Sequence, residues 1–224
     1  NENLLYRISY GKDSKGGNTL AFNGKSFTLL DLEKLIQEEK KQVSKLDQNA
    51  ITALFLIDRT IPMVLVNQVR EEMRKINALH IAEGGYPHGD LELSPLLYHT
   101  VGMPRLLPPL DAKTLDKEEV EKRGGIVYTV DLAARNTTPR DVDEGLQQFI
   151  RKNEGGKYVI SLEYDGAIPY GQYVETVDMI FQVIYRFREE LSLEKFRVAY
   201  DQLGDELQRE MRKAYPMALS ETMK

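Results

Sequence analysis

The stretch "FLIDRTIPMVLVNQVREEM", residues 55–73, is matched later in the chain by "SLEYDGAIPYGQYVETVDMIF", residues 161–181. In both, an apolar run typical of a buried strand ends at an aspartate, an Ile-Pro step follows, and an apolar pattern with helical spacing begins. The matching positions are each separated by 107 residues: Asp58 and Asp165, Ile61 and Ile168, Pro62 and Pro169. The sequence therefore predicts one structural unit that is present twice.

The helix that comes before each stretch supports this duplication with a slightly different offset. Thr138 follows Thr28 by 110 positions, and the same offset relates the next polar and apolar residues of the two segments: Asp31 and Asp141, Leu32 and Val142, Ile36 and Leu146. A difference of three residues between the two offsets corresponds to one insertion or deletion in a loop. The order of the predicted elements is thus shared although few residues are identical.

Each copy is predicted to alternate strands and helices. The first has strands at 4–10, 19–27, 50–58 and 78–83, with an Asn-Gly turn inside 19–27, a helix capped by Thr28, a helix after Pro62, and a stop at Gly84-Gly85. The second has strands at 125–134, 157–165 and 215–221, and helices beginning at Pro139, after Pro169 and at Ser192. We expect an α+β fold of two tandem small units, each with a mixed or antiparallel sheet and two helices on one face.

A proline- and leucine-rich segment separates the two copies. Residues 86–123 include Pro108-Pro109, which favours an extended backbone, and end in a charged stretch that predicts a turn or two of helix. We therefore expect a first unit at 1–85, a connector at 86–123 that packs on a unit, and a second unit with an extra helix at 124–224.

Composition restricts the function classes. The chain has 224 residues, a formal net charge of −5, and basic residues interspersed with acidic ones, a pattern that argues against nucleic-acid binding. It has no cysteine, so thiol nucleophiles, thiolate metal ligands and disulfides are excluded. No apolar run approaches the roughly 20 residues that span a membrane. The chain begins with Asn rather than Met, so a signal peptide or anchor before residue 1 stays open.

The residue types of the repeated motif suit a corner between a strand and a helix. An aspartate at a strand end accepts hydrogen bonds from turn N–H groups, and proline suits a helix start, where no N–H is needed. Gly171 permits a close approach of another segment. Turn chemistry thus explains the motif without any catalytic role, and we name its residues as structural or interaction sites: Asp58, Ile61, Pro62, Asp165, Gly166, Ile168, Pro169, Tyr170 and Gly171.

The motif resembles the periplasmic domain of the ExbD/TolR family. In "EYDGAIPYGQYVETVDMI", residues 163–180, the strand, Asp-Gly turn, Ile-Pro-Tyr-Gly step and helix all follow the family's order. Residues 56–73 are a degenerate copy, with Arg59 in place of the glycine and Met63-Val64 in place of Tyr-Gly. The lead-in "TLAFNGKSFTLLDLEKLI" is similar too. The resemblance covers about three quarters of the chain, but the motif is short.

The resemblance implies a non-enzymatic component of the cell envelope. ExbD/TolR-type proteins have a transmembrane helix that carries their functional aspartate and a periplasmic domain that dimerises, and they couple the proton gradient to TonB- or Tol-type work. That helix is absent from these 224 residues, and two copies stand where the family typically has one. We expect a periplasmic module anchored to the inner membrane, with protein partners and an intramolecular pseudo-dimer or a homodimer.

Side chains with chemical potential are few and scattered. His88, Asp90 and Glu92 alternate and would share a face of a strand, but a polar loop explains the same residues. Glu163 and Asp165 form a carboxylate pair on one predicted strand, without a partner element that would make them catalytic. Ser94 and Ser161 lack a nucleophile elbow. We expect no catalytic residue, no metal site and no cofactor.

Two classes of function stay open at this point. The first is a non-catalytic interaction or force-coupling module, which binds through strand edges or helix faces. The second is an extracytoplasmic ligand-binding or sensor part of a membrane protein, such as an envelope sensor-peptidase. A pocket with convergent polar groups would favour the second class.

Overall fold

A computed structural model describes residues 5–12, 15–45, 47–48, 51–78, 80–86, 99–107, 117–133 and 139–224. Contacts divide the chain into two compact units: Asn1–Ala112 with Gly166–Glu175, and Lys113–Asp165 with Thr176–Lys224. These boundaries differ from the expected ones at 85/86 and 123/124. The first unit extends further because the expected connector supplies a strand to its sheet, and because residues 166–175 pack on it.

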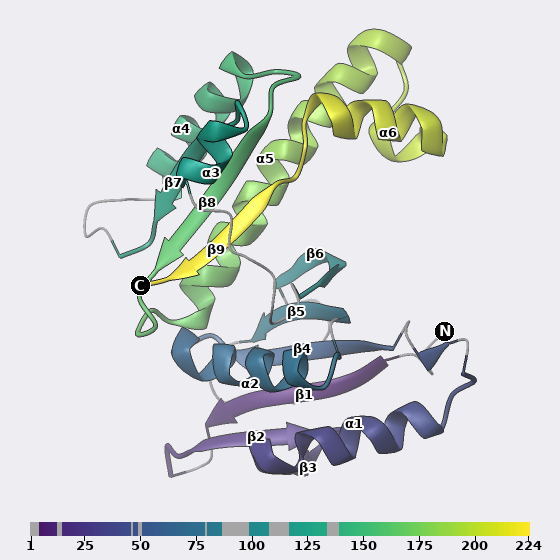
Figure 1. The fold of residues 1–224 in the computed structure, drawn as a ribbon, viewed down its shortest axis with the longest axis vertical. Coiled ribbons are helices and arrows are strands. Elements are labelled where there is room, and N and C mark those ends of the chain that lie inside the picture. The colour runs from purple at the N-terminus through teal and green to yellow at the C-terminus, as the bar shows by residue number, and fades with distance from the viewer. Residues whose placement is uncertain are drawn as a thin grey trace. The chain divides into compact units, whose positions relative to one another are not determined.

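The first unit is built on a six-stranded mixed sheet with the order β3-β2-β1-β4-β5-β6 (Figure 1). The strands are β1 (Leu5–Lys12), β2 (Asn18–Phe22), β3 (Lys25–Ser26), β4 (Thr52–Asp58), β5 (His80–Tyr86) and β6 (His99–Leu106). β1, β4 and β5 run parallel, and β2, β3 and β6 each join by an antiparallel pairing. β5 continues through Gly84-Gly85, so the stop predicted there is wrong: both glycines pair with β6.

The Asn-Gly turn of the first unit forms as its residue types predict. Phe22 pairs with Lys25, which leaves Asn23 and Gly24 as a two-residue loop with φ values of 47° and 81°. Thr28 then caps the 3₁₀ turn Leu29–Asp31: its backbone N–H and its hydroxyl both donate to Asp31, at 3.1 and 2.7 Å. These bonds to Thr28 lower the pKa of Asp31.

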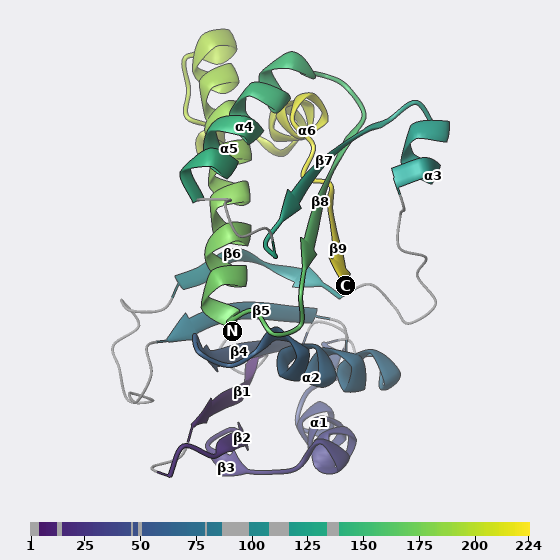
Figure 2. The same cartoon turned by 90° about the vertical axis from the view of Figure 1, so that its left-hand side faces the viewer.

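Two helices cover one face of the first sheet. They are α1 (Leu32–Lys41) and α2 (Met63–Lys75). The chain crosses from β1 to β4 through α1 and from β4 to β5 through α2, always in the same direction along the sheet, so right-handed crossovers place both helices on the same side (Figure 2). Their apolar faces are buried at the predicted helical spacing: Leu32, Ile36, Val66, Val69 and Met73.

The second unit has a three-stranded sheet with the order β7-β8-β9. The strands are β7 (Ile126–Asp131), β8 (Tyr158–Tyr164) and β9 (Leu219–Met223). Both pairings are parallel. The α+β class is confirmed, but the expected mixed or antiparallel sheet is wrong for this unit. A helix separates each pair of successive strands, and such a crossover brings the next strand in with the same direction.

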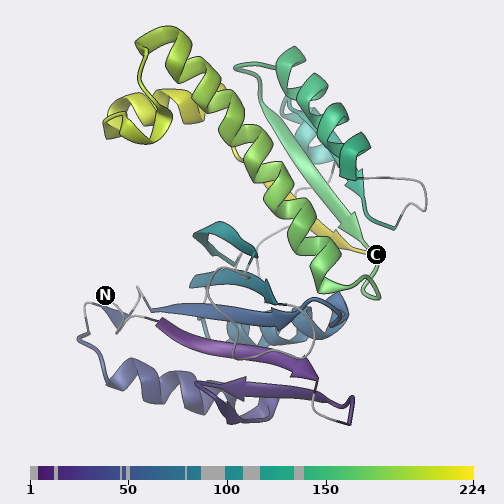
Figure 3. The same cartoon turned by 180° about the vertical axis from the view of Figure 1, so that it is seen from behind.

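Three longer helices follow β7 in the chain: α4 (Pro139–Lys152), α5 (Tyr170–Phe196) and α6 (Asp205–Ala214). The residues of α5 up to Glu175 belong to the first unit and the rest to the second. α5 runs along the second sheet on the same face as α4 (Figures 2 and 3). α5 is longer than predicted and passes through Ser192, where a new helix was expected; it ends before Arg197, whose φ is 57°. α6 begins only after Gly204. The short helix α3 (Lys117–Lys122) precedes β7.

The two units share an order of elements. β1-α1-β4-α2-β5 in the first corresponds to β7-α4-β8-α5-β9 in the second, and in both the three strands are parallel with the second strand in the middle. The β2–β3 hairpin is an addition to the first unit and α6 an addition to the second. The structural counterpart of β7 is therefore β1, and not the strand predicted at 19–27, although that strand directly precedes the first helix in the sequence.

Candidate functional site

The two copies of the motif meet inside the first unit. The first corner, residues 58–64, joins β4 to α2, and the second corner, residues 165–171, joins β8 to α5. From Gly166 to Glu175 the chain belongs to the first unit. There Pro62 and Pro169 face each other in an antiparallel bridge. The residues that the sequence singled out as a motif are thus brought together by the fold.

Four backbone hydrogen bonds join the corners. The Met63 N–H donates to the Ile168 carbonyl at 2.9 Å, and the Tyr170 N–H donates to the Ile61 carbonyl at 2.8 Å. Outside these, the Val64 N–H donates to Gly166 at 2.8 Å and the Gly171 N–H to Arg59 at 2.9 Å. Within each of these two pairs of bonds, one bond gives the other when 107 is added to its first-corner residue and subtracted from its second-corner residue. The backbone pairing therefore has local two-fold pseudosymmetry.

The bonding pattern explains a proline in both copies. Pro62 and Pro169 lie between the bonded residues, at a position where opposed residues of an antiparallel pair exchange no hydrogen bonds. Proline has no N–H to lose there, and its fixed φ suits the start of the helix that follows. The flanking apolar side chains are buried: Ile61, Met63, Ile168 and Tyr170. The motif therefore serves to join two segments of chain.

Around this backbone, side chains of the two corners differ. Arg59 lies over Gly171, where a Cβ would come within 2.9 Å of the Arg59 Cβ and 3.2 Å of the Arg59 carbonyl oxygen. The Arg59 guanidinium forms an ion pair with Glu175. The close approach requires glycine at 171, which agrees with the role that the sequence suggested for it.

A buried arginine adds a second polar contact. Arg70 on α2 is 1% exposed and donates to Asn67 Oδ1 and to the Tyr173 hydroxyl, each at 3.1 Å. Its guanidinium carbon also lies 4.9 Å from the centroid of the Tyr173 ring. Arg70 was not among the residues predicted from the sequence. Its position on the apolar face of α2, with Val66, Val69 and Met73, is the signal that could have identified it.

The two motif aspartates have different environments. Asp58 is 1% exposed, and its Oδ1 accepts bonds from the backbone N–H and the hydroxyl of Thr60, both at 2.8 Å, as expected for a strand-end aspartate. Asp165 is exposed and lies just after β8. The sequence predicted one role for both. Ala167 stands where Thr60 stands in the first copy, so the second corner lacks the hydroxyl that donates to Asp58.

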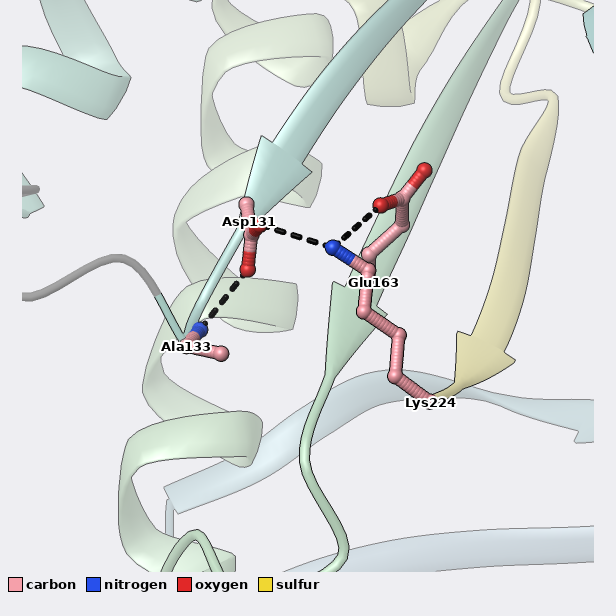
Figure 4. Close-up of polar contacts among 4 residues, drawn as sticks. All are labelled: Asp131, Ala133, Glu163 and Lys224. Atoms are coloured by element: carbon pink, nitrogen blue, oxygen red, sulfur yellow. Dashed lines mark hydrogen bonds and ion pairs between the residues drawn. The ribbon is translucent and has the colours of Figure 1, made fainter.

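The second unit carries a separate polar cluster at the carboxyl ends of its strands (Figure 4). Lys224 Nζ lies 2.8 Å from both Asp131 Oδ2 and Glu163 Oε2, and these carboxylates raise the pKa of Lys224. The Ala133 N–H donates to the other oxygen of Asp131 at 2.8 Å. Glu163 therefore shares the Lys224 ammonium with Asp131. The predicted pair of Glu163 with Asp165 on one strand is wrong, because β8 ends before Asp165.

Tyr158 in the second unit carries a buried hydroxyl whose effect on stability can be measured. Its hydroxyl has no hydrogen-bond partner among the described residues, and burial raises the pKa of Tyr158 to about 12. We expect Tyr158→Phe to raise the free energy of unfolding by about 1 kcal/mol, because an unsatisfied buried hydroxyl is removed. Urea unfolding measures this change. Tyr185→Phe at an exposed ring is the control, and a Tyr158→Phe variant less stable than wild type would contradict the expectation.

The same tyrosine predicts a pH dependence. The folded protein holds the Tyr158 proton up to about pH 12, whereas the unfolded chain releases it near pH 10. Ionisation of this group therefore leaves the free energy of unfolding unchanged below pH 10 and lowers it by about 2–3 kcal/mol as the pH rises from 10 to 12. Urea midpoints between pH 9 and 12 should fall more steeply for wild type than for Tyr158→Phe. Equal slopes would refute this linkage.

Two further findings concern the described residues. None of their helices has the length and apolar character needed to cross a membrane. Nor do three or more metal-ligating side chains gather in this part of the structure. The candidate ligands His88, Asp90 and Glu92, as well as Ser94, lie outside the described residues.

Comparisons with known proteins give no relative for this chain. No family model matches it, and neither a curated protein nor a solved structure is similar to it at the level that would indicate kinship.

Proposed function

We propose that the chain is a non-catalytic interaction or force-coupling module of the cell envelope, similar to the periplasmic part of ExbD/TolR-type transport components. One observation carries the proposal: the two motif copies pair through four reciprocal backbone hydrogen bonds around Pro62 and Pro169. A motif that uses its main chain to join two segments fits a protein-contact role. In this proposal the tandem copies form a pseudo-dimer within one chain, and an envelope protein is the external partner.

A cysteine pair tests both the pairing and the compartment. The chain has no cysteine, so Pro62→Cys with Pro169→Cys introduces a single candidate disulfide. Residues opposed at such a bridge position have Cα atoms about 4.5 Å apart, at the short end of the range for disulfides. We expect the purified variant to form the intramolecular bond with mild oxidant. Expressed in cells with its natural flanking sequence, it should be oxidised without added oxidant, because disulfides persist outside the cytoplasm.

Two results would contradict the proposal. A variant that oxidises after purification but stays reduced in cells would place the chain in a reducing compartment. Hydrolytic turnover by the purified protein that disappears in Asp165→Asn would show an enzyme. Pro62→Cys with Pro169→Ser is the matched control, since it loses both prolines but has no partner thiol.

The polar cluster of the second unit favours the alternative, an extracytoplasmic ligand-binding or sensor part. Asp131, Glu163 and Lys224 gather at the carboxyl ends of parallel strands, the edge where α/β sheets bind ligands. If they serve a ligand, Lys224→Met should abolish a saturable binding signal in a thermal-shift screen of charged metabolites. If Lys224→Met changes only stability, the cluster is an ion-pair network that ties β9 to its sheet.

A further inference from the structure

The backbone hydrogen bonds of the paired corners do not distinguish one copy of the motif from the other. Each of its four hydrogen bonds has an equivalent under the 107-residue offset, with lengths of 2.8–2.9 Å throughout. If the backbone alone decided, the corner at 58–64 could pair equally well with the same corner, 58–64, of another chain. Any selectivity must therefore come from side chains, and the side chains are where the copies differ.

Two outer pairs flank the prolines: Arg59 with Gly171, and Val64 with Gly166. Each pair combines one glycine with one residue that carries a side chain. At the first pair there is no room for two, because a Cβ on residue 171 would lie 2.9 Å from the Arg59 Cβ and 3.0 Å from its Nε. Two first corners would place Arg59 opposite Val64, and the Cβ of Val64 would occupy this forbidden position.

Polar contacts show the same asymmetry. Arg59 forms its ion pair with Glu175, whereas the equivalent residues by offset are Gly166 and Gln68, which carry no charge. The Arg70 bond to the Tyr173 hydroxyl likewise has two valines at its equivalent positions, Val177 and Val66. Neither contact could form between two identical corners.

We infer that the corner interface is heterotypic: the corner at 58–64 is built to receive the corner at 165–171, and rejects a copy of itself. Arg59, Gly171 and Glu175 are its specificity-determining residues. This deepens the proposed pairing and rests on it. Under this inference each corner accepts only the other corner as its partner, and the same chain supplies that partner. Association of chains through identical corners is therefore disfavoured.

A double-mutant cycle tests the steric part. Gly171→Ala should lower the equilibrium constant for folding at least tenfold in urea titrations, although alanine is the better helix former. In the Arg59→Gly background the same substitution should cost less than threefold, because the opposing Cβ is gone. Gly204→Ala is the control, since a Cβ there meets nothing within 4 Å. Equal losses of Gly171→Ala in both backgrounds would overturn the inference.

The cysteine pair tests the pairing itself. In the Pro62→Cys, Pro169→Cys protein, adding Gly166→Arg and Gly171→Val gives the second corner the outer residues of the first. We expect the rate of intramolecular oxidation to fall at least tenfold, with the disulfide yield of an unfolded sample in urea unchanged. An unchanged native rate would refute heterotypic selection. If the parent cysteine pair fails to oxidise, the pairing is wrong, and with it the basis of the proposed function.

Discussion

Replacing Met73 with alanine is expected to lower the free energy of unfolding of the first unit by about 2–5 kcal/mol. Met73 is 0% exposed and lies on the apolar face of α2 with Val66 and Val69, which are also buried. The substitution removes buried methylene and thioether groups and leaves a cavity that the parallel strands beneath α2 close only in part. Urea unfolding gives the stability change, and hydrogen exchange of β4 amides assigns it to this unit.

Leu30→Ala is the control for this prediction. Leu30 is 95% exposed in the 3₁₀ turn that precedes α1, so its truncation should change stability by less than about 0.5 kcal/mol. A Met73→Ala protein with an unfolding midpoint equal to that of Leu30→Ala would show that α2 does not anchor the first unit through this face.

Local features of the fold were predictable because short segments of sequence determine them. Asn23-Gly24 supplies the positive φ values of a two-residue hairpin loop, and Thr28 with Asp31 provides the capping bonds. The buried faces of α2 and α5 follow from apolar residues at helical spacing. Six apolar residues set this spacing, and all of them are buried: Val66, Val69, Met73, Tyr173, Val177 and Ile180.

Features that depend on distant segments were not predictable in the same way. The direction of β9 follows from the crossover through α5 and α6, and the role of residues 99–106 depends on pairing with β5. The meeting of Pro62 with Pro169 joins segments more than a hundred residues apart. Nothing in the local pattern specifies such a contact, although the repeated motif did identify the residues that make it.

The site residues show where similarity between copies misleads. Asp58 and Asp165 share their place in the motif, yet one is buried beside Thr60 and the other is exposed. The departures from the motif carry more information. Arg59, which replaces a glycine, takes part in an ion pair with Glu175. The first copy, which departs from the motif, is thus the complementary half of an interface. A comparison of the two motif sequences alone would treat these departures as random sequence divergence.

Replacing Arg70 with alanine is expected to destabilise the first unit by about 3 kcal/mol. The side chain is 1% exposed, donates to Asn67 and Tyr173, and stacks over the Tyr173 ring. Truncation removes both hydrogen bonds in a buried setting and leaves the volume of a long side chain unfilled. Because Tyr173 lies at the start of α5, within the segment that packs on the first unit, loss of Arg70 should also slow oxidation of the Pro62→Cys, Pro169→Cys pair.

Two further variants separate the reasons for this loss. Arg70→Lys keeps the charge but not the planar fork of donors, so a loss nearly as large as that of Arg70→Ala would show that the hydrogen-bond geometry matters most. Arg140→Ala is the matched control, because Arg140 pairs with Glu144 on the exposed surface of α4 and contributes at most about 0.5 kcal/mol. An Arg70→Ala loss no larger than that of Arg140→Ala, with an unchanged oxidation rate, would show that the buried arginine does not support the paired corners.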